Sequence, residues 1–411
     1  MTPMRYLFQF VFFYPFFMAL FWIVGSLVFY WRQERHRKQP ELASHPQVTV
    51  LIPCHDEQLT IEQVVRAAAA SRYPNLDILV VEDASTDSSP AILERLLTEI
   101  PNLRLLRLER NLGKAKALNL GALATEAEYL MCIDADALLD VDAIHWMVFD
   151  LERNPRVGAV TGNPRVLNRT TLISRIQVGE FSAIIGMIKR TQRLLGRVYT
   201  VSGVCSCFRR LAVHEVGYWS SDTVTEDVDI SWKLQLAYWG ILYEPRAVCW
   251  ILVPESLRGL WRQRLRWARG GMEAALRHSG SILHWTRRRM WPVLTELVVS
   301  TAWCYAVFLV LIAWLLTQVM PAWIPPRLQV ATLLPGWSGS LLAVVCLLQF
   351  LTGLAVDRRY EGRGLIRQLF WAIWYPAFYW VIAAGTSVVA LPLALRYRGR
   401  TGHATWQSPD R

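Results

Sequence analysis

Four long apolar runs constrain this chain more than any other feature of its sequence. Crossing the hydrocarbon core of a bilayer takes about 20 helical residues, and each run is long enough to do so. Between the first and second runs lies a long stretch of mixed polarity that is typical of a globular domain. We therefore predict a soluble domain held in a helical membrane frame, with apolar runs at Tyr6–Trp31, Leu297–Met320, Trp337–Val356 and Leu369–Leu395.

The charges that flank the first run predict its orientation. Lysine and arginine concentrate on the cytoplasmic side of membrane spans. The run is not followed by a small-residue cleavage site, so we interpret it as a signal anchor rather than a signal peptide. The globular domain is therefore expected in the cytoplasm and the N-terminus outside. Only Arg5 precedes the run, whereas four basic residues follow it, namely Arg32, Arg35, Arg37 and Lys38.

The last apolar run conflicts with this simple topology. The arginine-rich loop Asp357–Arg367 is expected to be cytoplasmic. Four complete crossings would then leave the basic residues Arg396, Arg398 and Arg400 outside. Either the charge rule fails at the last run, or one run does not cross the membrane completely. The sequence leaves both alternatives open.

The net charge of +11 comes from 44 Lys and Arg against 33 Asp and Glu, and the basic residues crowd beside the apolar runs. Such clusters also occur in nucleic-acid-binding proteins. Anionic lipid headgroups explain them better here, because each basic residue near such a surface gains about 1 kcal/mol. We therefore expect membrane lipids as partners and no nucleic acid. The seven cysteines include no CxxC pair, which argues against a zinc site.

The stretch from Gln47 to Val160 alternates short β-rich runs with helical segments. This pattern predicts βαβ units and a mainly parallel sheet of the α/β, Rossmann-like class. The expected strands are Val48–Pro53, Asp77–Val81, Leu103–Leu108, Tyr129–Ile133 and Val157–Val160. The expected helices are Ile61–Ala70, Pro90–Ile100, Lys114–Thr125 and Asp142–Arg153.

Three of the expected strands end in polar residues, and sheets of this class bind ligands at the carboxyl ends of their strands. Asp134 and Asp136 are one residue apart, so both side chains project to one side of an extended chain. Two carboxylates there suit Mg²⁺ or Mn²⁺, which completes its coordination with phosphate and water. A solvated turn is the alternative, which a strand end disfavours. The other polar residues are His55, Asp56, Glu57, Glu82 and Asp83.

Two further positions suit a nucleotide. Asp83 can accept a hydrogen bond from a nucleobase N–H, while Ser85, Thr86 or Asp87 can cap the following helix. In the turn 111–114, Lys114 and exposed backbone N–H groups precede a helix, which favours an anionic ligand such as a diphosphate. Glycine turns before helices are common, so this second signal does not stand alone.

Thr225-Glu226-Asp227 opens a helix-like stretch that runs through Leu236. A carboxylate at a loop-to-helix junction suits a general base, which takes the proton of an attacking hydroxyl. The alternative is a capping threonine followed by first-turn acids that complement the helix dipole. Without the other motifs, these three residues favour the capping role.

Gln263, Arg266 and Trp267 lie in a basic, aromatic stretch and share one face of a helix at i, i+3 and i+4. Arginine suits a diphosphate, and tryptophan offers a flat face to a sugar ring. The alternative is an amphipathic helix on the membrane surface, and the two roles are compatible. Arg264 points elsewhere on this helix and is expected to be mainly a lipid-facing charge.

In this order, the motifs resemble those of the processive family 2 glycosyltransferases, which include cellulose, chitin and hyaluronan synthases. The last motif, Gln263-x-x-Arg266-Trp267, is typical of the processive members. The others are the strand end Pro53–Glu57, Asp83, the Asp134/Asp136 pair and Thr225–Asp227. Further stretches resemble the branch that makes bacterial poly-β-1,6-linked N-acetylglucosamine for biofilms, at 160–165, 184–193, 217–220, 260–267 and 406–410.

The resemblance implies a GT-A fold, UDP-N-acetylglucosamine as donor, Mg²⁺ or Mn²⁺ as cofactor and an inverting mechanism. It also implies a growing polysaccharide extruded across the bacterial inner membrane, a small membrane partner subunit and stimulation by cyclic di-GMP. It assigns catalysis to Glu226 and Asp227, and the metal to Asp134 and Asp136. Donor binding falls to Pro53, Glu57, Asp83, Lys114, Asp134, Gln263 and Arg266, and acceptor binding to Gly203 and Trp267.

These expectations divide the chain into five parts: a membrane anchor at 1–31, a GT-A domain at 46–250, amphipathic interface helices at 251–291, transmembrane helices at 297–395 and a tail at 396–411. Two other functions remain open. One is synthesis of another β-linked polysaccharide, such as a chitin-, hyaluronan- or cellulose-like chain. The other is a nucleotide-binding scaffold that has lost catalysis, against which the retention of all the carboxylates argues.

Overall fold

The soluble part of the chain is built on one eight-stranded sheet of order β3-β2-β1-β4-β7-β6-β8-β5. The computed structural model describes residues 3–35, 38–330, 332–333, 336–372 and 375–396. Strands β3, β2, β1 and β4 are parallel, whereas β7 runs antiparallel between β4 and β6. The strands are β1 Val48–Cys54, β2 Leu76–Glu82, β3 Leu103–Arg107, β4 Tyr129–Ile133, β5 Ala137–Leu139, β6 Val157–Val166, β7 Cys205–Arg209 and β8 Gly240–Ile251.

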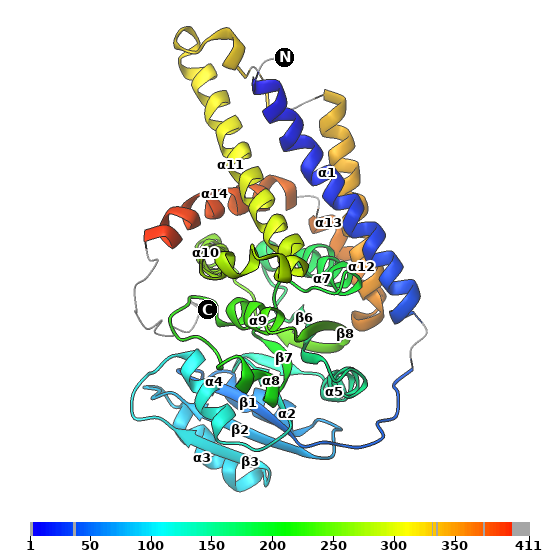
Figure 1. Cartoon of the computed structure of the whole chain (residues 1–411), viewed down its shortest axis with the longest axis vertical. Helices are drawn as coiled ribbons and strands as arrows, with labels where there is room; N and C mark the ends of the chain where they lie inside the picture. The colour runs from blue at the N-terminus through cyan, green and yellow to red at the C-terminus, as the bar shows by residue number, and fades with distance from the viewer. Residues whose placement is uncertain (1–2, 36–37, 331, 334–335, 373–374, 397–411) are drawn as a thin grey trace.

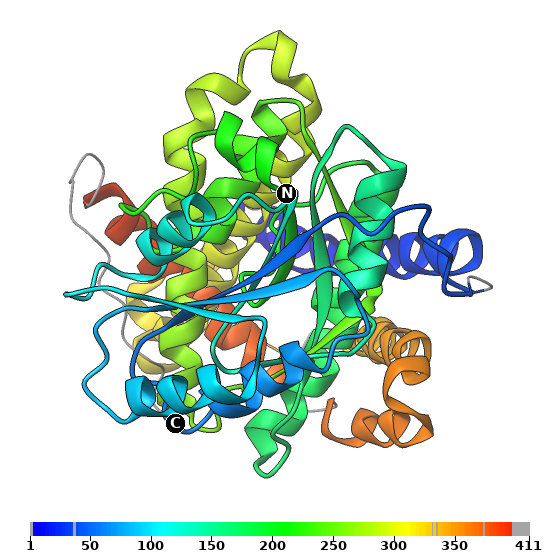
Figure 2. The same ribbon diagram turned by 90° about the horizontal axis from the view of Figure 1, so that it is seen from below.

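Helices cover both faces of this sheet, as the view from below shows (Figure 2). Because β1 is buried on both faces, its sequence is nearly continuously apolar rather than alternating. Val50 and Ile52 belong to a core that includes α2, α3 and α5, and Leu51 belongs to a second core with α4, α8 and α9. These helices are α2 Ile61–Ala69, α3 Ser89–Glu99, α4 Lys114–Leu123, α5 Ala143–Arg153, α8 Arg210–Glu215 and α9 Glu226–Leu236.

The expected α/β class with a mainly parallel sheet is confirmed. All the expected strands and helices of the first half are present, although β6 continues to Val166, beyond the expected Val160. Three strands were not expected, namely β5, β7 and β8. They introduce the antiparallel pairs β4–β7, β6–β7 and β5–β8, so the sheet is mixed.

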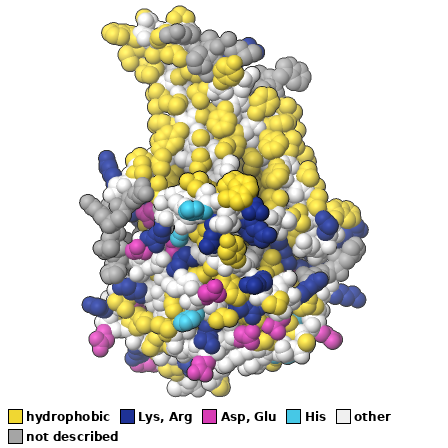
Figure 3. All heavy atoms as spheres, in the orientation of Figure 1, with side chains coloured by type: hydrophobic (Ala, Val, Ile, Leu, Met, Phe, Trp, Pro, Cys, Tyr) yellow, Lys and Arg dark blue, Asp and Glu magenta, His cyan; other side chains and the backbone are white. Residues whose placement is uncertain are grey.

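The apolar helices stand together at one end of the molecule (Figure 1), where hydrophobic side chains dominate the surface (Figure 3). Helix α1, Pro3–Phe29, continues into the π-helix η1, Tyr30–Glu34. Helices α11 and α12 span Trp291–Val319 and Gly336–Glu361. Among the described residues, four stretches qualify as membrane spans by length and composition: Met4–Glu34, Trp285–Val319, Gly339–Glu361 and Tyr379–Arg396.

The last of these stretches differs in direction from the other three. Helices α1, α11 and α12 run roughly along the molecule, whereas α14, Tyr375–Arg396, lies across it and contacts α10, Leu257–Ile282 (Figure 1). Within the described residues, the expected run Leu369–Leu395 is helical at α13, Leu369–Ala372, and at α14, and residues 373–374 lie outside the described part. Whether this last run crosses the membrane completely stays a prediction. Of the expected tail at 396–411, all but Arg396 lies outside the described residues.

A π-helical segment interrupts the long helix beside the first apolar helix. Helix α6, Leu172–Glu180, passes into η2, Phe181–Gly186, and then into α7, Met187–Leu194. A π turn takes up an extra residue and so changes which side chains face a given neighbour. The polar side chains of α7 at Lys189 and Arg190 are buried. Short 3-10 segments complete the chain at η3 Trp285–Met290, η4 Pro321–Trp323, η5 Pro326–Leu328 and η6 Arg363–Gln368.

A buried network of ion pairs joins the apolar helices to the soluble domain. Arg190 lies 2.9 Å from Glu34 at the end of η1 and 2.6 Å from Asp357 of α12. Arg165 of β6 lies 2.6 Å from the other oxygen of Asp357 and also pairs with Glu361. These side chains are almost completely inaccessible to solvent. Segments that are far apart in the sequence are thereby held at one point.

We predict that Arg190→Met destabilises the whole protein. The change leaves the Glu34 carboxylate buried without its arginine partner and leaves Asp357 with Arg165 alone. Breaking a buried pair typically costs about 3–5 kcal/mol. The measurement is the midpoint of thermal unfolding in detergent, which should fall clearly. Arg107→Met is the control, because its ion pair with Glu94 is exposed at the surface and should contribute little. Equal small shifts in both variants would contradict the prediction.

Candidate active site

The carboxyl ends of β1 and β2 meet in a polar corner. His55 Nδ1 lies 2.8 Å from the backbone oxygen of Asp83, and His55 Nε2 lies 2.9 Å from Asn111 Nδ2. Pro53 pairs in register with Val81 and so lies beside this corner. Glu57 is buried, and its carboxylate accepts a hydrogen bond from the Thr60 hydroxyl at 3.1 Å. The polar residues that follow these two strands are therefore close together, as expected.

The carboxylate of Asp83 holds the turn before α4. Its Oδ1 accepts from Leu112 N at 2.7 Å and its Oδ2 from Gly113 N at 2.8 Å, and the side chain is fully buried. The N–H groups of Leu112 and Gly113 are therefore not open to an anionic ligand, in contrast to the exposed donors expected in this turn, while diphosphate binding by Lys114 stays a prediction. The physical reason is that a buried carboxylate of the protein already satisfies them. Each carboxylate oxygen retains a lone pair, so nucleobase binding by Asp83 stays a prediction.

Lys114, the first residue of α4, is the centre of a charged cluster. Its Nζ lies 2.6 Å from Asp134 Oδ1 and 2.9 Å from Glu226 Oε1, so it joins the end of β4 to the start of α9. A side chain on Gly203 would come within 3.3 Å of Lys114 Nζ and within 3.2 Å of Asp227 Oδ2. Predicted site residues from separate segments therefore converge here, and the missing side chain of Gly203 leaves room between them.

The two adjacent acids of α9 have different electrostatic surroundings. Burial and the negative charge of Glu226 raise the pKa of Asp227 to about 6, although Lys114 and Arg266 oppose this rise. Burial also acts to raise the pKa of Glu226, but contact with Lys114 outweighs it and lowers that pKa. Glu226 is thus held as a carboxylate, whereas Asp227 can take up a proton near neutral pH. This is the behaviour required of a general base.

Asp134 and Asp136 lie at the turn between β4 and β5, and both are partly exposed. Within the residues that the structure describes, no three histidine, cysteine or acidic side chains gather closely enough to hold a metal ion by themselves. A hard cation such as Mg²⁺ often takes only one or two protein carboxylates when phosphate oxygens complete its coordination. The pair therefore fits a cation that arrives with a phosphate-bearing ligand.

Helix α9 begins directly against α10. Thr225 is the N-cap residue of α9, yet its side chain makes no capping hydrogen bond, so the capping alternative is not supported for this hydroxyl. Thr225 instead faces Gly270 of α10, where an added Cβ would lie only 1.9 Å from Thr225 Oγ1. Glycine is thus required for this close approach, which holds α10 against the turn that carries Asp227.

Helix α10 also brings the expected basic and aromatic residues to the site. The charge of Arg266 acts on both Glu226 and Asp227 and stabilises their ionised forms. Trp267 is half-buried and packs against the main core. Gln263 has a buried side-chain oxygen with no hydrogen-bond partner among the described residues. An unsatisfied buried acceptor of this kind calls for a partner, which a bound ligand can supply.

Arg264 is not the lipid-facing charge that we expected. Its side chain is buried, and its Nη2 donates to Glu180 Oε2 of α6 at 2.6 Å. Its guanidinium also lies 4.2 Å from the centre of the Trp267 ring. Helical spacing indicates which residues of α10 share a face with Arg264. It does not reveal that Glu180 of α6 lies against that face. Arg264 therefore helps to orient Trp267.

Lys189 of α7 is a site residue that the sequence analysis missed. Its Nζ donates to Thr161 Oγ1 at 3.3 Å, and the same hydroxyl accepts from Ser202 N at 2.7 Å, directly before Gly203. Burial lowers the pKa of Lys189 to about 8, while the charge of Asp227 opposes that shift. The stretch 184–193 was noted only for its resemblance to the family, and Lys189 was not singled out, because a polar helical segment is normally exposed to solvent.

Comparison with known proteins places this geometry in context. The family described as "Glycosyltransferase like family 2" matches residues 45–270. A poly-β-1,6-N-acetyl-D-glucosamine synthase of Staphylococcus epidermidis is 38% identical over 99% of this chain and 98% of its own length. The protein of the same description in Staphylococcus aureus strain COL is 39% identical over 98% of each chain.

A solved structure supports the fold. A mannosyltransferase from Pyrobaculum calidifontis, in complex with GDP-Man and Mn²⁺, aligns with a TM-score of 0.60 and 20% identity. The alignment covers 94% of this chain and 99% of that one. At this identity the likeness concerns the fold alone, and the expected GT-A fold is confirmed.

We predict that Gly270→Ala destabilises the protein by about 1–3 kcal/mol, a typical cost of overpacking. The added methyl group would collide with Thr225, which is buried and β-branched and so cannot swing away freely. Gly280→Ala in the same helix is the matched control, because nothing lies within 4 Å of its added Cβ. Alanine should stabilise that position by about 0.5–1 kcal/mol. Thermal unfolding midpoints distinguish the two, and a Gly270→Ala variant as stable as Gly280→Ala would refute the contact.

Proposed function

The chain belongs to the family 2 glycosyltransferases, and we propose that it polymerises N-acetylglucosamine from UDP-N-acetylglucosamine into a poly-β-1,6-linked chain. The observation that carries the catalytic part of this proposal is the Asp227 carboxyl, whose pKa is raised to about 6 beside Lys114 and Arg266. A base and two cations side by side suit sugar transfer from a nucleotide diphosphate. The choice of sugar and linkage rests on the named relatives.

In the proposed reaction, Asp227 takes the proton from the acceptor hydroxyl as that oxygen attacks the anomeric carbon of the donor. The bond between this carbon and the diphosphate breaks, and UDP leaves with the electron pair. Attack opposite the leaving group inverts the configuration at the anomeric carbon. Lys114 and Arg266 attract the charge that develops on the diphosphate. Glu226, held as a carboxylate, keeps Lys114 in position.

The remaining predicted residues divide between donor, metal and acceptor. Pro53, Glu57 and Asp83 flank the proposed uridine site at the ends of β1 and β2, and Gln263 is proposed to contact the diphosphate. Asp134 and Asp136 would hold Mg²⁺ or Mn²⁺, which would supply charge neutralisation for the diphosphate. Gly203 leaves room for the acceptor sugar, and Trp267 offers a ring face to it. These roles stay proposals.

We also propose how the enzyme sits in the membrane. Helices α1, α11 and α12 would cross it, while α14 lies along the cytoplasmic surface beside α10. Three crossings leave Arg396 on the cytoplasmic side, in agreement with the positive-inside rule. Extrusion of the polymer across the bacterial inner membrane, a small partner subunit and stimulation by cyclic di-GMP rest on the resemblance to the family alone.

One experiment tests the proposed function. Purified full-length protein is incubated with UDP-N-acetylglucosamine and Mg²⁺ while UDP release and polymer are measured. We expect both products, and we expect a chelator to abolish them. Asp136→Asn should act like the chelator, because an amide is a poorer ligand for a hard cation. Preference for another UDP-sugar would indicate a different β-linked polysaccharide, and no release from any donor would indicate the inactive scaffold.

We predict that Asp227→Asn retains UDP binding but loses about 10²–10⁴-fold in turnover, the usual contribution of a positioned base. In the unmodified enzyme the base must be ionised, so kcat/KM should rise with pH, level off above about 6 and fall below it. That acidic limb should be absent from the residual activity of the variant. Parallel loss of UDP affinity with normal turnover of bound donor would make Asp227 a binding residue instead.

A further inference from the structure

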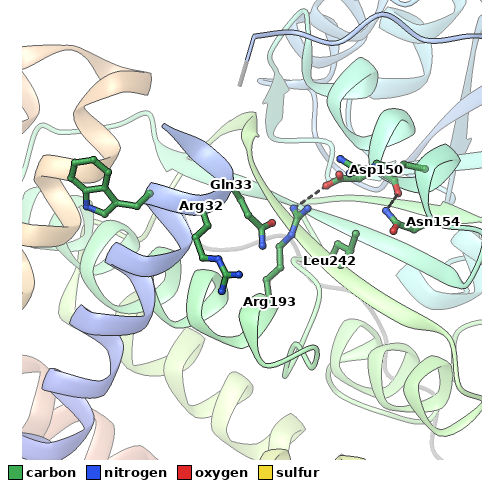
Figure 4. A pocket seen from close by; sticks show the side chains of 8 residues that line it. Arg32, Gln33, Asp150, Asn154, Arg193 and Leu242 are labelled. Atoms are coloured by element: carbon green, nitrogen blue, oxygen red, sulfur yellow. Dashed lines mark hydrogen bonds and ion pairs between the residues drawn. The ribbon is translucent and has the colours of Figure 1, made fainter. Parts of the chain in front are cut away.

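A cavity of about 630 Å³ opens where the first apolar helix meets the soluble domain (Figure 4). It lies apart from the catalytic acids and is not lined by any of them. Arg32 and Gln33 enter it from η1, Arg153 and Asn154 from the end of α5, and Arg193 from α7. Figure 4 shows the side chains of Arg32 and Gln33 extending from η1 on the side of Arg193. Membrane helix and soluble domain thus share the walls of this cavity.

The charges around the cavity are only partly balanced. Arg193 is paired, because its Nη1 lies 2.8 Å from Asp150 and 3.6 Å from Glu244. Arg32 and Arg153 are both exposed, and neither forms an ion pair with any residue that the structure describes. Two guanidinium groups from separate elements therefore face one opening without a counter-charge. Such an arrangement favours an anion that presents several oxygen acceptors, such as a phosphodiester.

The position of the cavity along the apolar helix indicates which kind of anion it would bind. Bulky apolar side chains remain exposed along α1 and at the start of η1, including Phe17 at 64% and Val24 at 60% in α1 and Trp31 at 58% in η1. This surface is suited to lipid chains, and Trp31 is of the type that marks the level of the headgroups. Arg32 is the very next residue. The mouth of the cavity therefore lies where acyl chains give way to headgroups.

We propose that this cavity is a binding site for the phosphate of an anionic phospholipid headgroup, held by Arg32 and Arg153. The acyl chains of the lipid lie along the exposed apolar face of α1, and the headgroup reaches between η1 and the end of α5. The paired Arg193 and Asp150 form a neutral polar wall, and the Gln33 and Asn154 amides offer hydrogen-bond donors to the headgroup. The site ties one lipid to both the span and the catalytic domain.

The test measures binding of short-chain phosphatidylglycerol to the full-length protein in neutral detergent. Phosphatidylcholine of the same chain length and glycerophosphoglycerol, which has the headgroup but no chains, are the other two probes. We expect saturable binding of phosphatidylglycerol that weakens on the order of 10-fold or more in Arg32→Gln/Arg153→Gln, because two basic contacts are lost. Arg288→Gln is the matched control, because this exposed arginine also flanks an apolar helix but lies outside the cavity.

A charge-conserving variant and the unfolding temperatures complete the test. Arg32→Lys/Arg153→Lys should retain most of the binding, since the charges remain, and all variants should unfold at the same temperature as the unmodified protein. Equal binding by the double glutamine variant would overturn the proposal, as would equal affinity for phosphatidylcholine. Glycerophosphoglycerol binding as tightly as the lipid would also overturn it, because the occupant would then be a soluble phosphodiester.

Discussion

Two buried arginines, Arg165 and Arg190, hold the soluble domain and the apolar helices in one structure. Removing such charges from water costs several kcal/mol each, and the cost is offset only while every partner carboxylate is in place. Those partners lie at the end of the first apolar helix and along α12, at Glu34, Asp357 and Glu361. The family match ends at residue 270, but the electrostatic balance of the matched region depends on residues beyond both of its ends. The catalytic domain is therefore not a separable module.

The candidate active site depends in a similar way on contact between the sheet and α10. Lys114 and Asp134 come from the sheet side, whereas Arg266 comes from α10. The contact between Thr225 and Gly270 fixes the distance between these two contributions. The electrostatic surroundings of Asp227 therefore depend on Lys114 of α4 and on Arg266 of α10. Its pKa consequently depends on how closely α10 packs against the sheet domain. One helix, α10, therefore contributes both to the surroundings of Asp227 and to the contact with α14.

Much of this arrangement could be predicted from the sequence, for reasons that particular residues illustrate. Asp134 was recognised because it ends an apolar strand in a βαβ pattern, where ligands bind. Strand β8 was missed because Pro245 and charged residues interrupt its apolar pattern. Arg264 was misplaced and Lys189 overlooked for a common reason: helical spacing shows which side chains share a face, but not which distant element covers that face. Partners such as Glu180 become visible only in three dimensions.

The π-helical segment Phe181–Gly186 determines the direction in which the later side chains of that helix point. Upstream of it, Glu180 meets Arg264, and downstream of it, Arg190 meets Glu34 and Asp357. Successive residues of an α-helix are rotated by about 100° about the helix axis. The extra residue of a π turn therefore changes the angle between the side chains that make these two contacts. An α-helix shorter by one residue satisfies either contact but not both. The segment thus supplies the rotation that lets one helix make both contacts, and its length matters more to this chain than the identity of its side chains.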